Sequence, residues 1–76
     1  MDKKGQLIEY ITQDLVAYVA EEFGLSVKEA MNKVYSSKLY EKILDTETGL
    51  YLEGSGYVYG ILKDELKYGR LVQMEI

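Results

Sequence analysis

The sequence predicts a mainly α-helical fold: a small domain of four helices, of which the middle two are short. Apolar residues recur at helical spacing over several stretches, serines stand before the helical stretches, and glycines follow two of them. The chain contains no proline, so glycine is its main helix breaker. Its 76 residues are enough for one domain, residues 1–76, with a thin hydrophobic core.

The first helix is expected over residues 6–23. Its apolar positions fall on one broad face at 100° per residue. They are Leu7, Ile8, Ile11, Leu15, Tyr18, Val19 and Phe23. Gly24 stands where a left-handed residue ends many helices, and Leu25 can fold back onto the last turn.

Two short helices are expected next, over residues 26–35 and 37–44. Ser26 and Glu29 have the spacing of a capping box, in which each side chain bonds the backbone N–H of the other residue. A stripe of Val27, Ala30, Met31 and Val34 is expected to pack inward. Ser36 and Ser37 then interrupt the pattern and can cap the third helix, which presents Leu39, Tyr40, Ile43 and Leu44.

The last helix is expected over residues 56–68, with Ser55 as its N-cap and Gly69 as its end. Before it, residues 45–49 form a polar loop and residues 50–52 are extended or turn-like. The tail, residues 70–76, alternates imperfectly between apolar and polar residues. A minor β-ribbon between this tail and residues 50–53 is therefore a possible addition to the four helices.

No catalytic, metal or cofactor site is expected, and the chain is not predicted to be an enzyme. It has no histidine and no cysteine, which removes the commonest general base and the commonest metal ligands. The serines stand at helix starts, so capping is favoured over the one remaining nucleophile arrangement, a serine–lysine pair. Residues 45–49 resemble a calcium loop but lack its remaining ligands, and a solvated turn is expected there.

The cytoplasm is the expected location. No apolar run approaches the roughly 20 residues that a bilayer span needs. The first ten residues lack the apolar stretch of a signal peptide. Neither a membrane nor a small-molecule substrate is indicated as a partner.

Eight tyrosines stand against one phenylalanine and no tryptophan, which is typical of a small core's edge or of a protein interface. In the last helix Val58, Tyr59, Leu62 and Leu66 form one apolar stripe. A second stripe comprises Tyr57, Ile61 and Tyr68, and Glu65 falls between the two. We hypothesise that the second stripe and Glu65 face a partner protein or a second copy of the chain in a homodimer. The alternative is that residues 50–52 and the C-terminal tail cover this stripe.

DNA binding is the alternative function. Residues 26–44 could form a helix-turn-helix whose four lysines face phosphate, namely Lys28, Lys33, Lys38 and Lys42. The formal net charge of −4 and the lack of base-reading side chains on the second helix weigh against it.

The chain also resembles a group of short bacterial helical proteins that are often encoded beside toxin-like proteins. The resemblance lies in Gly24-Leu25-Ser26, Glu29-Ala30, Lys38-Leu39-Tyr40 and the tyrosine-rich stretch 57–66. This chain lacks the histidine of that group's fourth helix. The resemblance implies an antitoxin-like or accessory role through protein–protein interaction, with no catalytic residue.

Overall fold

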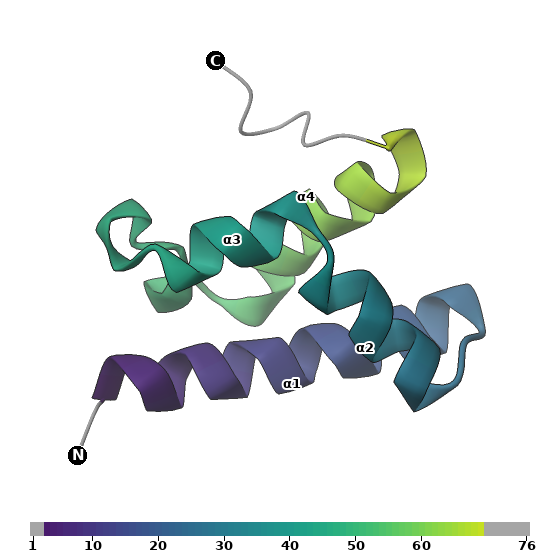
Figure 1. The fold of residues 1–76 in the computed structure, drawn as a ribbon, viewed down its shortest axis with the longest axis horizontal. Helices are drawn as coiled ribbons and strands as arrows, with labels where there is room; N and C mark the ends of the chain where they lie inside the picture. The colour runs from purple at the N-terminus through teal and green to yellow at the C-terminus, as the bar shows by residue number, and fades with distance from the viewer. Residues whose placement is uncertain (1–2, 70–76) are drawn as a thin grey trace.

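Four α-helices and two 3₁₀-helices follow one another in the computed structural model, which describes residues 3–69 (Figure 1). They are α1 (Lys3–Phe23), α2 (Val27–Tyr35), α3 (Lys38–Leu44), η1 (Thr46–Thr48), η2 (Leu50–Leu52) and α4 (Ser55–Tyr68). The predicted mainly helical fold with two short middle helices is confirmed. No strand occurs among residues 3–69, so residues 50–53 do not form one of the two strands of the predicted β-ribbon. The tail that would provide the other half lies outside the described residues.

The long helix α1 contacts most of the other elements. It runs along one side of the molecule, with α2 folded back against it and α3 and α4 stacked on the other side (Figure 1). Its buried positions Ile11, Leu15 and Val19 are spaced by four residues, so they form one stripe. The other buried apolar residues meet this stripe: Ala30, Val34, Leu39, Ile43, Leu50, Tyr51, Val58, Tyr59, Ile61 and Leu62.

The predicted capping box is present. Ser26 Oγ accepts from the backbone N–H of Glu29 at 3.1 Å, and the Ser26 backbone N–H donates to Glu29 Oε1 at 3.1 Å. Gly24 and Gly69 follow α1 and α4 with φ of 64° and 76°, a left-handed conformation that costs glycine little. Local sequence signals therefore place the end of α1, the start of α2 and the end of α4.

Two predicted helix starts are wrong. α1 begins at Lys3 rather than at residue 6, because apolar periodicity marks only the turns that pack and not an exposed first turn. α4 begins at Ser55, with Gly54 as its N-cap. Ser55 is the first helical residue and not the N-cap, and its hydroxyl donates to Asp14 Oδ2 of α1 at 2.6 Å.

The connection between α3 and α4 is more ordered than a loop. η1 and η2 are separated by Gly49 at φ 72°, and η2 buries Leu50 and Tyr51. Of the two conformations expected for residues 50–52, extended or turn-like, the structure has the turn-like one. At the suggested calcium loop, Asp45 Oδ1 accepts from the backbone N–H of Glu47 at 3.1 Å, as in an ordinary polar turn.

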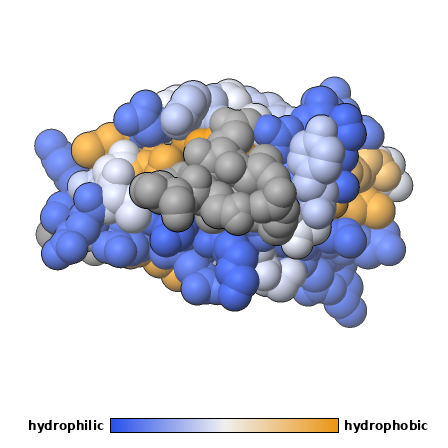
Figure 2. Space-filling model, turned by 90° about the horizontal axis from the view of Figure 1, so that it is seen from above, coloured by the Kyte–Doolittle hydropathy of each residue, from blue (hydrophilic) through white to orange (hydrophobic). Residues whose placement is uncertain are grey.

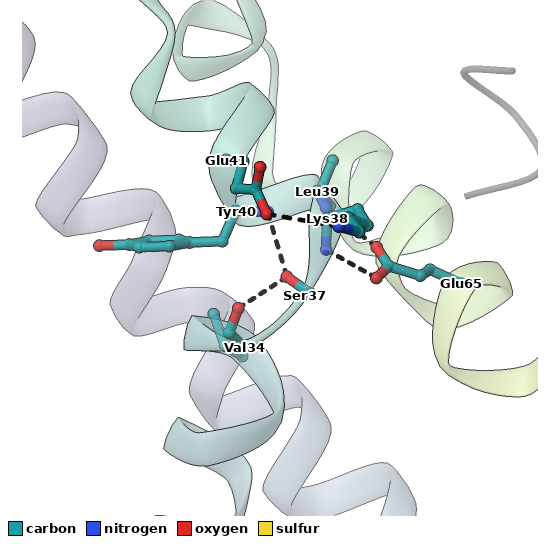
Figure 3. A network of polar contacts seen from close by, with 7 residues as sticks. All are labelled: Val34, Ser37, Lys38, Leu39, Tyr40, Glu41 and Glu65. Carbon is teal, nitrogen blue, oxygen red and sulfur yellow. Dashed lines mark hydrogen bonds and ion pairs between the residues drawn. The ribbon is translucent and has the colours of Figure 1, made fainter. Parts of the chain in front are cut away.

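Glu65 of α4 holds α3 in place. The residue is 8% exposed, and its carboxylate accepts from the backbone N–H groups of Lys38 at 2.7 Å and of Leu39 at 2.9 Å (Figure 3). The Ser37 hydroxyl accepts a hydrogen bond from the next backbone N–H of the helix, that of Tyr40, at 3.1 Å. It also donates a hydrogen bond to the carbonyl oxygen of Val34 at 2.6 Å. The first turn of α3 thus has its orphan donors satisfied from α4 and from the α2–α3 connection.

The capping box should make stability depend on pH. The backbone N–H and hydroxyl of Ser26 lower the pKa of Glu29, so its stabilisation is present above the unfolded value near 4.5 and is lost as pH falls through the lowered pKa. We expect Glu29→Gln to reduce the free energy of unfolding at pH 7 and to matter progressively less below pH 4.5. Urea denaturation across this range measures the difference. The exposed Glu47→Gln is the control, and an equal loss for Glu29→Gln at both ends of the range would contradict the assignment.

Loss of the Glu65 carboxylate should be far more costly than loss of an exposed one. Glu65→Ala leaves two backbone donors of α3 without an acceptor, and each such buried group costs about 1–3 kcal/mol. We expect a loss of roughly 2–4 kcal/mol in urea denaturation. Glu41→Ala, which removes an exposed carboxylate 3.9 Å from Lys38 Nζ, should cost less than about 1 kcal/mol. Similar losses for both variants would show that Glu65 does not hold α3.

Candidate functional site

The predicted partner face of α4 is divided by the structure. Tyr57 and Tyr68 are 61% and 60% exposed, whereas Ile61 and Glu65 are only 2% and 8% exposed. The expectation that these four residues share one exposed face is therefore wrong for Ile61 and Glu65. The physical reason is that both α1 and α3 pack against α4, so Ile61 and Glu65 are buried while the two tyrosines of the stripe stay at the surface. Tyr68 also has Lys67 Nζ 5.6 Å from its ring centre.

The four lysines of the alternative DNA surface are all exposed. Lys28 and Lys33 lie on α2, and Lys38 and Lys42 lie on α3, with only Ser36 and Ser37 between the two helices. Lys38 Nζ lies 3.9 Å from Glu41 Oε2. These positions permit a helix-turn-helix but supply no contact that favours nucleic acid, so DNA binding stays a prediction.

A groove runs between α1, α2 and α3. Two hollows, of about 210 and 450 Å³, share four of their lining residues and so form one feature. One wall is α1, with Ile8, Thr12 and Val16 spaced by four residues. The facing wall is α2, whose Val27, Met31 and Tyr35 have the same spacing. We call this feature the α1–α2 groove.

The wider end of the α1–α2 groove is closed by an aromatic pair. Tyr40 of α3 lies edge-to-face against Tyr35 of α2, with ring centres 5.1 Å apart. The Tyr40 side chain extends from α3 toward α1 (Figure 3). Because Glu65 and Ser37 fix the first turn of α3, they also fix the position of this ring.

Polar side chains on the α1 wall of the groove bond within α1. The Thr12 hydroxyl donates to Ile8 O at 2.6 Å, which leaves the threonine methyl group as the apolar part of its side chain. Gln13 Nε2 donates to Glu9 Oε1 at 3.4 Å. Apolar side chains with polar groups beside them are a usual composition of a protein-binding surface.

The sequence analysis missed this groove because it assigned Val27 and Met31 to the core. In the structure α2 buries only Ala30 and Val34, and Val27 is 64% exposed. The sequence signal that could have indicated the groove is the apolar series at residues 27, 31 and 35, which lies beside the buried residues Ala30 and Val34 on α2. Together these residues cover a wider arc of α2 than one packed neighbour requires.

Seen from above the view of Figure 1, the surface is mainly hydrophilic, with small apolar areas toward its two ends (Figure 2). Within residues 3–69, no group of three or more acidic side chains is placed to hold a metal ion. In the same part of the chain, no helix has the length and apolar character to cross a membrane.

Comparison of the chain with protein-family models, with curated proteins and with solved structures found no match. The candidate site therefore depends on the geometry of this structure alone.

The revised location of the α4 residues can be tested by stability. Ile61→Ala should lower the free energy of unfolding by about 2–5 kcal/mol, because it leaves a cavity in the core. Tyr57→Ala, four residues earlier on the same helix, should change it by less than about 0.5 kcal/mol because the ring is exposed. Urea denaturation of both variants measures the contrast. If Ile61→Ala left the free energy of unfolding unchanged, Ile61 would have to lie at the surface.

Proposed function

We propose that this chain is a non-enzymatic protein-interaction module whose α1–α2 groove receives an amphipathic helix of another protein. The observation that carries the proposal is the exposed apolar series Val27, Met31 and Tyr35, which faces Ile8 and Val16 across the groove. A partner that buries these side chains removes apolar surface from water, which stabilises the complex. An antitoxin-like or accessory role in the cytoplasm is the setting that we propose for this activity.

The spacing of the groove suits a helical partner. Residues 27 to 35 rise about 12 Å along α2, which is a little over two helical turns. A partner helix presents anchors at i, i+3 or i+4, and i+7 over the same length. Met31 can adapt to the shape of an anchor, whereas Tyr35, held by Tyr40, offers a rigid ring.

Charge favours a different protein over a second copy. The chain has a formal net charge of −4, and Glu9 stands at the edge of the groove. A second copy would bring the same negative charge, which slows its approach. At the α1 edge of the groove, a lysine or arginine beside the apolar face of the partner helix would complement Glu9, whereas α2 carries the exposed Lys28 and Lys33.

Site-specific photocrosslinking tests the proposal. The photoreactive residue benzoylphenylalanine would replace Tyr35 in one variant and the similarly exposed Tyr57 of α4 in a matched control. In native lysate we expect a discrete adduct from position 35 and none from position 57. Addition of Met31→Glu to the position-35 variant should reduce the adduct at least about tenfold, because it places a charge in an apolar contact. Circular dichroism checks that each variant remains folded.

Three results would contradict the proposal. Crosslinked adducts from position 57 and none from position 35 would show that the interface lies on the exposed part of α4. An adduct of twice the chain mass would make the occupant a second copy. A position-35 adduct that survives Met31→Glu would show that the groove is not the contact.

A further inference from the structure

The two ends of the α1–α2 groove differ in size. The hollow at the end of Val16 and Val27 measures about 210 Å³, whereas the hollow at the end of Ile8 and Tyr40 measures about 450 Å³. Met31 lines both hollows, so a single helix laid along the groove reaches both. Its anchoring side chains at the two ends therefore need not be of the same size.

The two ends also differ in chemistry. The residues that line the narrow end alone are Val16 and Val27, both apolar. The wide end alone includes Ile8, the Tyr40 ring and the Glu9 carboxylate. Glu9 is the one charged residue among the described residues that line the groove. An aliphatic anchor therefore suits the narrow end, whereas the wide end suits a larger apolar side chain that carries a polar donor.

Glu9 provides the acceptor for such a donor. Its Oε1 atom accepts from Gln13 Nε2 at 3.4 Å, which is long for a hydrogen bond and leaves Oε2 for a ligand group. A carboxylate only accepts hydrogen bonds, so the matching ligand group is an N–H or an O–H. The aromatic pair of Tyr35 and Tyr40 stands at the same end, so the donor is best carried by a side chain that also packs on rings.

We infer that the partner helix places a tryptophan in the wide end, with its indole N–H donated to Glu9, and an aliphatic residue such as leucine in the narrow end. This inference rests on the proposed function of the groove. Tryptophan combines a large apolar ring system with a single N–H donor, so it fills the larger hollow and matches the one carboxylate. It is also among the residues that contribute most to binding when they fill a pocket.

Other side chains match the wide end less well. Phenylalanine has no donor for Glu9, and tyrosine fills less of the hollow. Arginine brings five N–H donors to an end with one carboxylate, and several of them would lose water without gaining an acceptor.

Designed helical peptides test the inference on the full chain. Each has about 15 residues, a lactam bridge that keeps it helical and anchors at positions i, i+4 and i+7. The first two anchors are leucine, and the third is tryptophan, 1-methyltryptophan, tyrosine, arginine or leucine. The 1-methyl group removes the N–H donor and keeps the ring. Isothermal titration calorimetry measures the Kd of each peptide.

We expect the tryptophan peptide to bind most tightly, at least about tenfold more tightly than the all-leucine peptide. Methylation of the indole nitrogen should weaken binding about 3- to 10-fold, as expected for one hydrogen bond to an exposed carboxylate. A nitroxide label beside the third anchor should broaden the ¹H–¹⁵N NMR signals of Ile8 and Tyr40 more than those of Val16 and Val27.

Two variants assign the hydrogen bond to Glu9. On Glu9→Ala the tryptophan and 1-methyltryptophan peptides should bind equally, because the acceptor is gone. Glu21→Ala, which removes another exposed carboxylate of α1, should leave their difference unchanged. Circular dichroism checks that both variants stay folded.

Met31→Glu separates this inference from the proposed function. It should abolish binding of every peptide, since it places a charge in the middle of the groove. Equal or tighter binding of any other peptide than the tryptophan one, or broadening at Val16 and Val27 instead, would overturn the inference while binding that Met31→Glu abolishes would support the groove. No binding at all, or binding that survives Met31→Glu, would count against both.

Discussion

The arrangement of this protein depends on the carboxylate of Glu65 and the first turn of α3. A helix of seven residues is too short to be stable alone, so α3 needs partners from elsewhere in the fold. Glu65 accepts hydrogen bonds from the first two N–H groups of α3, which lie 27 and 26 residues before it in the sequence. The Ser37 hydroxyl accepts the hydrogen bond of the third. The negative charge is also favourable where the free N–H groups of a helix begin. One buried side chain therefore joins the second half of the chain to the first.

The α1–α2 groove follows from this attachment and from the central position of α1. With α3 fixed, Tyr40 closes one end of the α1–α2 groove. α4 packs against both α3 and α1, and Tyr59 of α4 lies edge-to-face against Tyr18 of α1. α1 is a wall of the groove, and a core of limited size leaves apolar side chains such as Val27 and Met31 at the surface.

Features that depend on a few neighbouring residues could be predicted from the sequence. The Ser26–Glu29 capping box and the glycines at 24 and 69 need only local backbone geometry, and all three are present. The role of Ser55 could not be predicted, because the sequence shows neither which residue is the N-cap of α4 nor which distant group the hydroxyl reaches. Here Asp14, 41 residues away, accepts its hydrogen bond. Residues 50–52 likewise become a 3₁₀-helix where the sequence pattern also allowed an extended segment.

By itself the sequence determined the helical class, most helix ends and a surplus of apolar and tyrosine side chains over one small core. Only the tertiary structure decided which of them are buried. It placed Ile61 and Glu65 inside and left Val27 and Met31 outside. Helical periodicity shows which residues share a face, but the neighbour that covers that face is chosen by contacts between distant segments. The hydrogen bonds from Glu65 to α3 are such contacts, and no local pattern around residue 65 specifies them.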